Sequence, residues 1–238
     1  MSHNQLLDNN IILNSEVHEY LLKDDPTFKF VSVTTFLSQF FDKFDADKIA
    51  TRLVSTSPKY MHMTVEELLE KWKKAGEHGT AVHNEIEQFL LDKTPVSEIK
   101  AINGIKWLES YTYGKKCTVL AEAIVYSKEL KLAGTIDLLI ENEDKTYSIV
   151  DWKTNAKLTM SSFKNKKGIH PITNTLDDCK FTLYSLQLSL YRYILENYYG
   201  LKIKELIIAH LKDNEVKAYL TPYYNNHMHE FSLLRKEE

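Results

Sequence analysis

Residues 130–154 read LKLAGTIDLLIENEDKTYSIVDWKT, with an apolar or alternating run on each side of the polar break ENEDK. The pattern over 130–141 and 146–154 predicts two β-strands, and the break predicts the turn of a hairpin. If the turn is centred on the aspartate of this break, Asp137 and Asp151 lie directly opposite each other. Opposed side chains in an antiparallel pair have Cβ atoms about 4.5–5.5 Å apart, so the hairpin brings two carboxylates together.

This carboxylate pair indicates a metal site. Two ionised carboxylates in a mostly apolar sheet repel each other, and a bound divalent cation removes the repulsion. Hard oxygen ligands suit Mg²⁺ or Mn²⁺. Lys153 projects from the same face as Asp151, where an amine can activate water or stabilise charge on a phosphate. Alternation places Ile136 and Leu138 together on the face opposite Asp137. The alternative is a solvated surface cluster of Asp and Lys, which contributes almost nothing to stability.

A histidine in a predicted helix offers a further metal ligand. His83 and Glu87 are spaced i, i+4 in the helix expected over about 80–91, so they share one face. Imidazole accepts Mn²⁺ and is tolerated in Mg²⁺ sites. A single helical histidine is also common as a structural residue, and the spacing leaves both interpretations open.

The rest of the chain predicts further helices and strands around the hairpin. The spacing of apolar residues predicts helices from a cap at Thr34 or Thr35 and over about 64–75, 97–112 and 178–198, with strands over 118–127, 204–211 and 215–221. Gly76 and Gly79 are expected to separate two helices, and Gly200 to end the last one. Helices followed by a strand meander, another helix and more strands predict an α/β (α+β) domain.

Composition excludes several classes of protein. No G-x-G-x-x-G, Gly-Lys-Ser or Gly-Lys-Thr sequence occurs, which excludes phosphate binding by the usual glycine-rich loops. Two cysteines, Cys117 and Cys179, are too few for a four-cysteine iron–sulfur or zinc site and indicate a reducing, intracellular compartment. No apolar run approaches about 18 residues and the N-terminus lacks a basic, apolar leader, so we expect a soluble protein with no membrane partner.

The net charge of −3 gives no overall attraction to nucleic acid, but one segment is basic. Between Trp152 and Asp177 there is no acidic residue, and there are five lysines: Lys153, Lys157, Lys164, Lys166 and Lys167. Such a segment either contacts phosphates without sequence specificity or is a solvated loop. Ser32 and Thr34 precede the first predicted helix, where they can bind a phosphate or act as simple caps.

Four motifs in a fixed order resemble one enzyme family. They are Gly79-Thr80-Ala81-Val82-His83, Gly134-Thr135-Ile136-Asp137, Asp151-Trp152-Lys153-Thr154 and Gln187-x-x-x-Tyr191. Together they resemble the PD-(D/E)XK nuclease superfamily in its RecB-like exonuclease branch, which is similar to the mitochondrial genome-maintenance exonuclease and to phage and viral recombination nucleases. The resemblance covers roughly residues 30–215 and implies a restriction-endonuclease-like core, with a central mixed sheet flanked by helices. We therefore expect an N-terminal arm over 1–30, a nuclease domain with a helical N-terminal part over 31–221, and a C-terminal tail over 222–238.

The resemblance also implies a role for each matching residue. The metal ligands would be His83, Asp137, Asp151 and the main-chain carbonyl of Trp152, and the catalytic residues would be Lys153, Asp137 and Asp151. Substrate contacts would come from Gln187, Tyr191 and Thr154 of the motifs; Lys157 of the basic segment, and Ser32 and Thr34 before the first helix, are further candidate phosphate contacts. Glu87 and Glu122 fall where relatives often carry acidic residues beside the metal site. Tyr191 can instead simply pack in the core, whereas Gln187 on the same helical face is harder to explain as a core residue.

The expected function is that of a Mg²⁺- or Mn²⁺-dependent deoxyribonuclease, most simply an exonuclease, without an iron–sulfur cluster. Its substrate would be single- or double-stranded DNA ends, and its partners recombination, repair or replication proteins in the cytoplasm or another DNA-containing compartment. Two alternatives stay open: a structure-specific endonuclease or RNase using the same site, and a non-catalytic DNA-binding module. The intact Asp137, Asp151 and Lys153 argue against the module, because a retired site has no reason to keep two repelling carboxylates.

Overall fold

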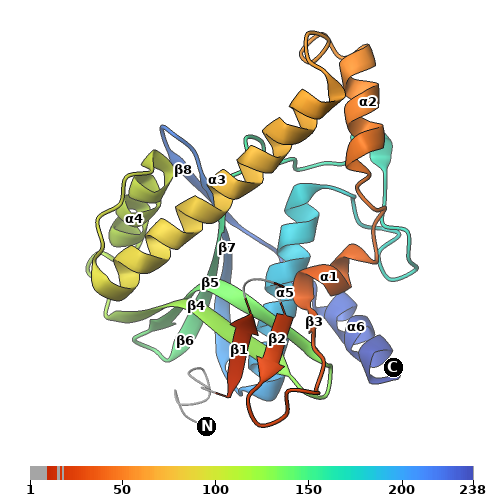
Figure 1. The fold of residues 1–238 in the computed structure, drawn as a ribbon. Helices are drawn as coiled ribbons and strands as arrows, with labels where there is room; N and C mark the ends of the chain where they lie inside the picture. Colours follow the sequence, from red (N-terminus) through yellow and green to blue (C-terminus); the bar gives the residue numbers. More distant parts are fainter. Residues whose placement is uncertain (1–9, 15–16, 18, 238) are drawn as a thin grey trace.

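The structure is a computed structural model that describes residues 10–14, 17 and 19–237 (Figure 1). Its strands are β1 (Ile11–Asn14), β2 (Glu19–Leu22), β3 (Val31–Ser32), β4 (Cys117–Ser127), β5 (Leu132–Asn142), β6 (Thr146–Lys153), β7 (Lys202–Leu211) and β8 (Val216–Leu220). Its helices are α1 (Val33–Ser38), α2 (Ala46–Thr56), α3 (Val65–Asp92), α4 (Ile99–Thr112), α5 (Lys180–Tyr198), α6 (Asn225–Glu237) and the short 3₁₀ helix η2 (Phe163–Asn165). None of the helices in this part of the chain has both the length and the hydrophobicity to cross a bilayer.

Six strands form one mixed sheet, which confirms the predicted fold class. The order is β3-β5-β6-β7-β8, and β4 pairs with β5 along nearly its whole length. β6 is antiparallel to β5 and parallel to β7, since the chain crosses over through α5 between β6 and β7. β3 and β6 share one edge of β5, because β3 pairs with Leu132 and Ala133 and β6 pairs from Leu138 onward. The described ladders leave residues 134–137 without a strand partner on this edge.

Helices cover both faces of the sheet (Figure 1). On one face α5 packs against β4, β6 and β7, and α1 and α6 pack against α5. On the other face α3 packs against β4, and α4 against β7 and β8. Each face buries its own hydrophobic cluster, with Leu186 and Ile194 of α5 in the first and Val82 and Ile86 of α3 in the second. Because both faces of β6 are covered, seven of its eight residues are buried, including the polar Thr146, Ser148 and Asp151.

One long helix replaces two predicted ones. The prediction that Gly76 and Gly79 separate two helices is wrong, because α3 continues without interruption through both glycines. A capping box begins this helix: Oγ1 of Thr64 accepts the N–H of Glu67, and the Glu67 carboxylate accepts the N–H of Thr64. A glycine inside a helix costs only about 1 kcal/mol relative to alanine, which the burial of the following turns readily offsets.

The two halves of α3 have different surroundings. Its second half lies over the sheet, whereas α2 and residues 65–76 of α3 project from the body of the molecule (Figure 1). We call α2 and residues 65–76 the arm. Because α3 is continuous, the arm is a direct extension of the helix that covers the sheet.

Both ends of the described chain contain structure that the sequence analysis did not predict. Within residues 1–30, which we expected to form an N-terminal extension, β1 and β2 form an antiparallel hairpin. Tyr20 and Leu22 of this hairpin pack against Ala133. Within the tail over 222–238, Phe231 of α6 is fully buried in the cluster that α1 and α5 share. Residues 1–9 lie outside the described residues, and the proposed domain boundaries stay predictions.

The first helix begins two to three residues earlier than predicted. Ser32, rather than Thr34 or Thr35, is the N-cap of α1, and its Oγ accepts the N–H of Thr35 at 3.1 Å. The predicted strands and the helices over 97–112 and 178–198 are confirmed, and their ends differ from the prediction by at most two residues.

Candidate active site

The hairpin of β5 and β6 has the register predicted from the sequence. Leu138 pairs with Val150, and the ladder stops there, one residue before Asp137 and Asp151. At this point Oδ2 of Asp137 accepts a hydrogen bond of 2.6 Å from the main-chain N–H of Trp152. The Asp137 carboxylate therefore joins the two strands where their backbone pairing ends.

A kink in β4 and β5 sets the direction of two carboxylates. Glu122 lies opposite Asp137, because the two strands pair on both sides of these residues in one continuous register. Glu122 has a φ of 48°, a left-handed conformation that costs a non-glycine residue roughly 1–3 kcal/mol. The alternation of faces changes here, so the prediction that Ile136 and Leu138 share a face is wrong. Ile136 packs in the cluster on the α5 side and Leu138 in the cluster on the α3 side.

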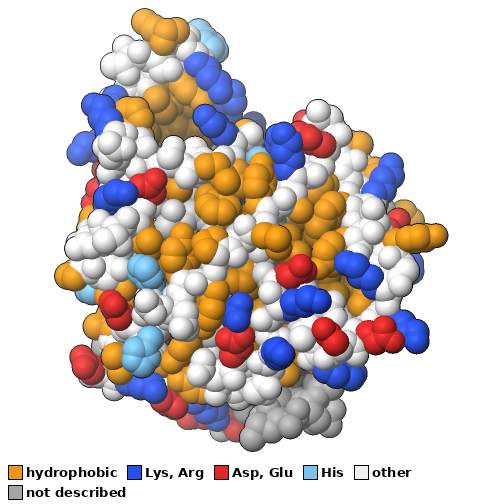
Figure 2. Space-filling view, turned by 180° about the vertical axis from the view of Figure 1, so that it is seen from behind, with side chains coloured by type: hydrophobic (Ala, Val, Ile, Leu, Met, Phe, Trp, Pro, Cys, Tyr) orange, Lys and Arg blue, Asp and Glu red, His pale blue; other side chains and the backbone are white. Residues whose placement is uncertain are grey.

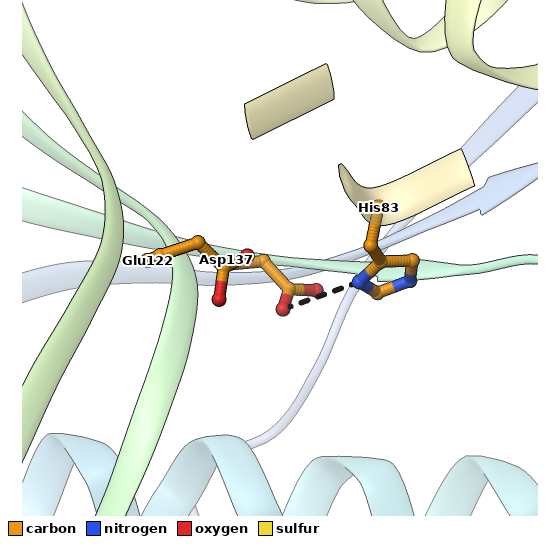
Figure 3. A group of neighbouring side chains, drawn as sticks. All are labelled: His83, Glu122 and Asp137. Atoms are coloured by element: carbon orange, nitrogen blue, oxygen red, sulfur yellow. Dashed lines mark ion pairs between the residues drawn. The ribbon is translucent and has the colours of Figure 1, made fainter. Parts of the chain in front are cut away.

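Three side chains from three elements form a group that can hold a metal ion. His83 of α3, Glu122 of β4 and Asp137 of β5 each offer a ligand atom, and these atoms all lie within 4.8 Å of one another (Figure 3). Nδ1 of His83 points at the Asp137 carboxylate, 3.5 Å from its Oδ1. The His83 side chain is 27% exposed and that of Asp137 13%, so the group is sheltered but open to a small ligand. The sequence analysis placed Glu122 only at the edge of this group.

The ionisation of Glu122 indicates that the group lacks positive charge. Burial, together with the negative charges of Asp137 and Glu87, raises the pKa of Glu122 to about 8 against the opposing effect of His83. Glu87, which the sequence placed one turn after His83, thus acts on the site through its charge. A divalent cation at this position would remove the repulsion, so the donor set fits a metal.

The two other members of the group stabilise each other's charged forms. Burial favours the neutral imidazole of His83, but the negative charge and hydrogen bond of Asp137 outweigh burial and raise the His83 pKa. Burial likewise favours the neutral acid at Asp137, but the charge and hydrogen bond of His83, the charge of Lys153 and the N–H of Trp152 lower the Asp137 pKa. Asp137 is therefore held as a carboxylate, ready to bind a cation.

The raised pKa of Glu122 predicts how stability depends on pH in EDTA. Its folded-state pKa of about 8 exceeds the ordinary value of 4.5, so the stability that this group contributes is complete below pH 4.5 and is lost as pH rises through 8. Glu122→Gln cannot ionise and avoids this loss, which is on the order of 2 kcal/mol at a partly exposed site. Thermal unfolding in EDTA should show that the stability of the variant, relative to that of the wild type, is greater at pH 8.5 than at pH 6. Equal differences at both pH values would contradict this account of Glu122.

Asp151 and Lys153 form a buried ion pair beside the group. Oδ2 of Asp151 lies 2.6 Å from Nζ of Lys153, and the two side chains are 5% and 16% exposed. Burial and the charge of Asp137 raise the pKa of Asp151 to about 6, against the opposing effect of Lys153. Burial would lower the pKa of Lys153, but the charges of Asp151 and Asp137 outweigh burial and raise it. Nζ also lies 4.4 Å from the ring centre of Tyr184, so Lys153 is held as an ammonium.

Gln187 and Tyr191 of α5 lie against this ion pair, as predicted. Nε2 of Gln187 donates to Oδ1 of Asp151 at 3.3 Å and to the hydroxyl of Tyr191 at 3.4 Å. Tyr191 is buried with its ring against Gly134, where an added Cβ would lie 2.5 Å from a ring carbon. The glycine of the Gly-Thr-Ile-Asp motif is therefore required for the close packing of β5 on Tyr191.

The backbone that follows Lys153 is anchored from three elements. An added Cβ at Gly79 of α3 would lie 2.8 Å from Oγ1 of Thr154, so α3 and the end of β6 are in close contact. Nζ of Lys100 in α4 donates to the Thr154 carbonyl at 3.1 Å, and Nε2 of His210 in β7 donates to the Asn155 carbonyl at 2.5 Å. The sequence analysis missed Lys100 and His210, because no local spacing relates them to the motifs.

The predicted basic segment is less basic in the folded chain. Lys166 forms ion pairs with Asp42 and Asp178, and Lys167 forms one with Asp177. The structure also places three further residues that we predicted to contact substrate: Lys157, Ser32 and Thr34. Lys157 is exposed and lies four residues after Lys153. Ser32 and Thr34 lie at the start of α1, where their hydroxyls are 3.2 Å apart. Their substrate contacts stay predictions.

Comparisons with known proteins give one family and several solved structures. A family model described as the PD-(D/E)XK nuclease superfamily matches residues 47–227, a range that contains every residue of the group and of the ion pair. Solved structures that match include the crystal structure of SSO0001, which is 11% identical, with 87% of this chain and 74% of that chain covered and a TM-score of 0.35. Another is the crystal structure of an exonuclease candidate from Eubacterium rectale, with 15% identity, 88% and 78% coverage and a TM-score of 0.38. No curated protein matches this chain.

Proposed function

This chain belongs to the PD-(D/E)XK nuclease superfamily, and from that premise we propose that it is a divalent-metal-dependent deoxyribonuclease that works as an exonuclease. The family implies a nucleic-acid substrate and hydrolysis of phosphodiester bonds. The observation that supports the proposal best is the group of His83, Glu122 and Asp137 directly beside the buried pair of Asp151 and Lys153. A surface cluster of Asp and Lys would be solvated, and these side chains are not.

The residues that would hold the metal are those that burial and repulsion leave short of positive charge. They are His83, Glu122 and Asp137, with Asp151 and the main-chain carbonyl of Trp152 as the further ligands that the resemblance implies. Two carboxylates and an imidazole suit Mn²⁺ and are tolerated by Mg²⁺. When bound, the cation supplies positive charge to a phosphate oxygen and lowers the pKa of a bound water.

The chain's own contribution to the reaction centres on Lys153. Its ammonium forms an ion pair with Asp151, and Gln187 holds Asp151 by a hydrogen bond. These contacts hold Nζ beside Asp151. A fixed positive charge beside a phosphate stabilises the negative charge that develops when water attacks it. Gln187 and Asp151 therefore act as positioning residues for Lys153. Thr154 and Lys157 would bind phosphates farther along the strand.

The exonuclease assignment predicts that the enzyme needs a free end. In Mg²⁺ or Mn²⁺, labelled linear DNA should be degraded, whereas covalently closed circular DNA of the same sequence should stay intact through the same time course. The measurement is the release of labelled nucleotide from the linear substrate and the conversion of the circle to nicked or linear forms. We place the activity in DNA recombination, repair or replication, where ends are trimmed.

The same assay separates the alternatives. Nicking or linearisation of the circle would assign the site to a structure-specific endonuclease, and preferential loss of a matched RNA strand would assign it to an RNase. DNA binding that is indifferent to EDTA, with no cleavage in Mn²⁺, would indicate a non-catalytic binding module.

A further inference from the structure

Two aromatic side chains form an exposed pair at the base of the arm. Phe44, which precedes α2, is 64% exposed, and its ring centre lies 5.7 Å from that of Trp72 in α3, with the planes tilted by 58°. The Trp72 side chain is itself only partly buried. Neither residue belongs to the hydrophobic clusters of the described core. The pair thus offers an aromatic surface to solvent that the packing of the core does not use.

The helix that carries Trp72 also carries His83, on the same side. The two residues are eleven positions apart in the uninterrupted helix α3, which returns the side chain to within about 20° of the same direction. The axial separation is about 16 Å. At about 3.4 Å per stacked nucleotide, this distance corresponds to roughly five nucleotides of one strand. A strand whose phosphate lies at the metal group can therefore extend along α3 to the aromatic pair.

A second segment connects the site to the same place. The loop that follows Lys153 is joined to the segment before α2 by the ion pair of Lys166 with Asp42 at 3.0 Å. The N–H of Ile169 in this loop also donates to the carbonyl of Phe40 at 2.9 Å. The loop that follows Lys153 is therefore held against the segment that leads to Phe44 and α2.

The charge around the aromatic pair suits a polyanion. On the Phe44 side of the pair, residues 43–62 contain four basic residues, Lys43, Lys48, Arg52 and Lys59, against two acidic ones, Asp45 and Asp47, whereas residues 65–76 around Trp72 are balanced, with three lysines and three glutamates. Asp45 caps α2 by accepting the N–H of Lys48, and none of the four cations forms an ion pair with a described residue. Figure 2 shows the arm as a lobe in which hydrophobic side chains line a hollow and Lys and Arg side chains stand around it. Exposed aromatic rings beside cations that form no ion pair are the combination that binds single-stranded nucleic acid.

We propose that Phe44 and Trp72 form a stacking platform that binds unpaired bases of the substrate strand about five nucleotides from the scissile phosphate. The proposal deepens the nuclease function and rests on it, because the occupant of the platform is the strand being cut. Single-stranded nucleic acid is the form that occupies the arm, because bases inside a duplex present no free face to an aromatic ring. The exposed cations contact the phosphates between the stacked bases.

The test compares binding of single and double strands after removal of one ring. In the Lys153→Ala background, which prevents cleavage, Phe44→Ala should weaken binding of a labelled 20-nucleotide thymidine strand by about tenfold. Binding of a blunt 20-base-pair duplex should change less than about twofold, and the salt dependence should keep its slope because no cation is lost. Phe44→Tyr keeps an aromatic ring and should restore binding. Tyr113→Ala is the matched control, because Tyr113 is an aromatic residue 88% exposed at the end of α4.

The fluorescence of Trp72 provides a second measurement, which DNA would not change if the aromatic pair were only structural. Stacking of a base on Trp72 should quench its fluorescence when the thymidine strand is added, and Trp72→Phe should remove the quench. Trp107 of α4 packs against Trp152 in the buried cluster on the α3 side of the sheet, so Trp72→Phe should leave the fluorescence of these two residues unchanged. Thermal unfolding of the Phe44→Ala protein controls for its fold.

The outcomes separate this inference from the nuclease function. Unchanged single-strand binding in Phe44→Ala, or an equal loss for the duplex, overturns the platform while the cleavage assay on the wild type stands on its own. Failure of the wild type to cut any strand in Mn²⁺ would overturn the nuclease function, whatever Phe44→Ala does to binding.

Discussion

Replacing Lys153 by alanine is expected to reduce nucleic-acid cleavage by at least about a hundredfold, the usual loss when one fixed electrostatic contact of a hydrolytic site is removed. The side chain is held by Asp151 at 2.6 Å and by the ring of Tyr184, so its charge is in place before substrate binds. Its loss also leaves Asp151 buried without a cation, which raises the Asp151 pKa above its value of about 6. Part of Asp151 would then be protonated at pH 7, which adds to the loss of activity.

The measurement is single-turnover cleavage of labelled DNA at saturating enzyme, with the fold checked by circular dichroism and thermal unfolding. Lys153→Met keeps the length of the apolar stem and controls for a packing defect. Lys212→Ala removes a lysine that pairs with Glu215 at 3.2 Å in the β7–β8 turn, and this variant should cut at the wild-type rate. Near-wild-type cleavage by both Lys153 variants would remove Lys153 from the catalytic machinery.

Asp137→Asn should have the second large effect, on metal binding as well as on cleavage. The asparagine carbonyl can still accept the N–H of Trp152, so the hairpin should keep its structure. The negative charge is lost, and with it one oxygen ligand and the partner that raises the His83 pKa. Loss of a residue that only holds a metal ligand in place typically costs about 10–100-fold in metal affinity, so loss of a direct ligand should cost more than about a hundredfold.

Isothermal titration with Mn²⁺ measures this loss directly. Glu143→Gln is the matched control, because Glu143 is an exposed acid that pairs with Lys116 on the surface at 3.4 Å. Its Mn²⁺ affinity should equal that of the wild type. Wild-type Mn²⁺ affinity in Asp137→Asn would show that the metal binds elsewhere.

The part of the site that could be predicted is the part encoded by short-range pattern. The turn between β5 and β6 and the alternation on each side of it determine the strand register, and this register brings Asp137 and Trp152 together. His83 could be predicted as well, because i, i+4 spacing places it on one face of a helix.

The role of Glu122 could not be predicted in the same way. Its side chain reaches Asp137 because the backbone at Glu122 is left-handed, and no strand pattern anticipates that conformation in a non-glycine residue. The same kink explains why Ile136 and Leu138 pack on different faces. Strict alternation across this point was therefore the wrong assumption.

Long-range packing accounts for the other differences. Gly76 and Gly79 predicted a break, but the turns of α3 beyond them are buried against the sheet, and this burial outweighs the small helical cost of glycine. The anchors Lys100 and His210 come from α4 and β7, far along the chain from Lys153, so only the folded structure relates them to it. Helix α6 likewise depends on its contact with α5 for its place in the core.

In the proposed reaction, this chain cuts DNA with a metal held by His83, Glu122 and Asp137. The most direct measurement is a time course with 5′- and 3′-labelled single- and double-stranded linear DNA in Mg²⁺, Mn²⁺ or EDTA, run in parallel with Asp137→Asn. We predict stepwise release of nucleotides by the wild type in Mg²⁺ or Mn²⁺, and none in EDTA or with the variant. Equal degradation in EDTA, or full activity of Asp137→Asn, would contradict the claim.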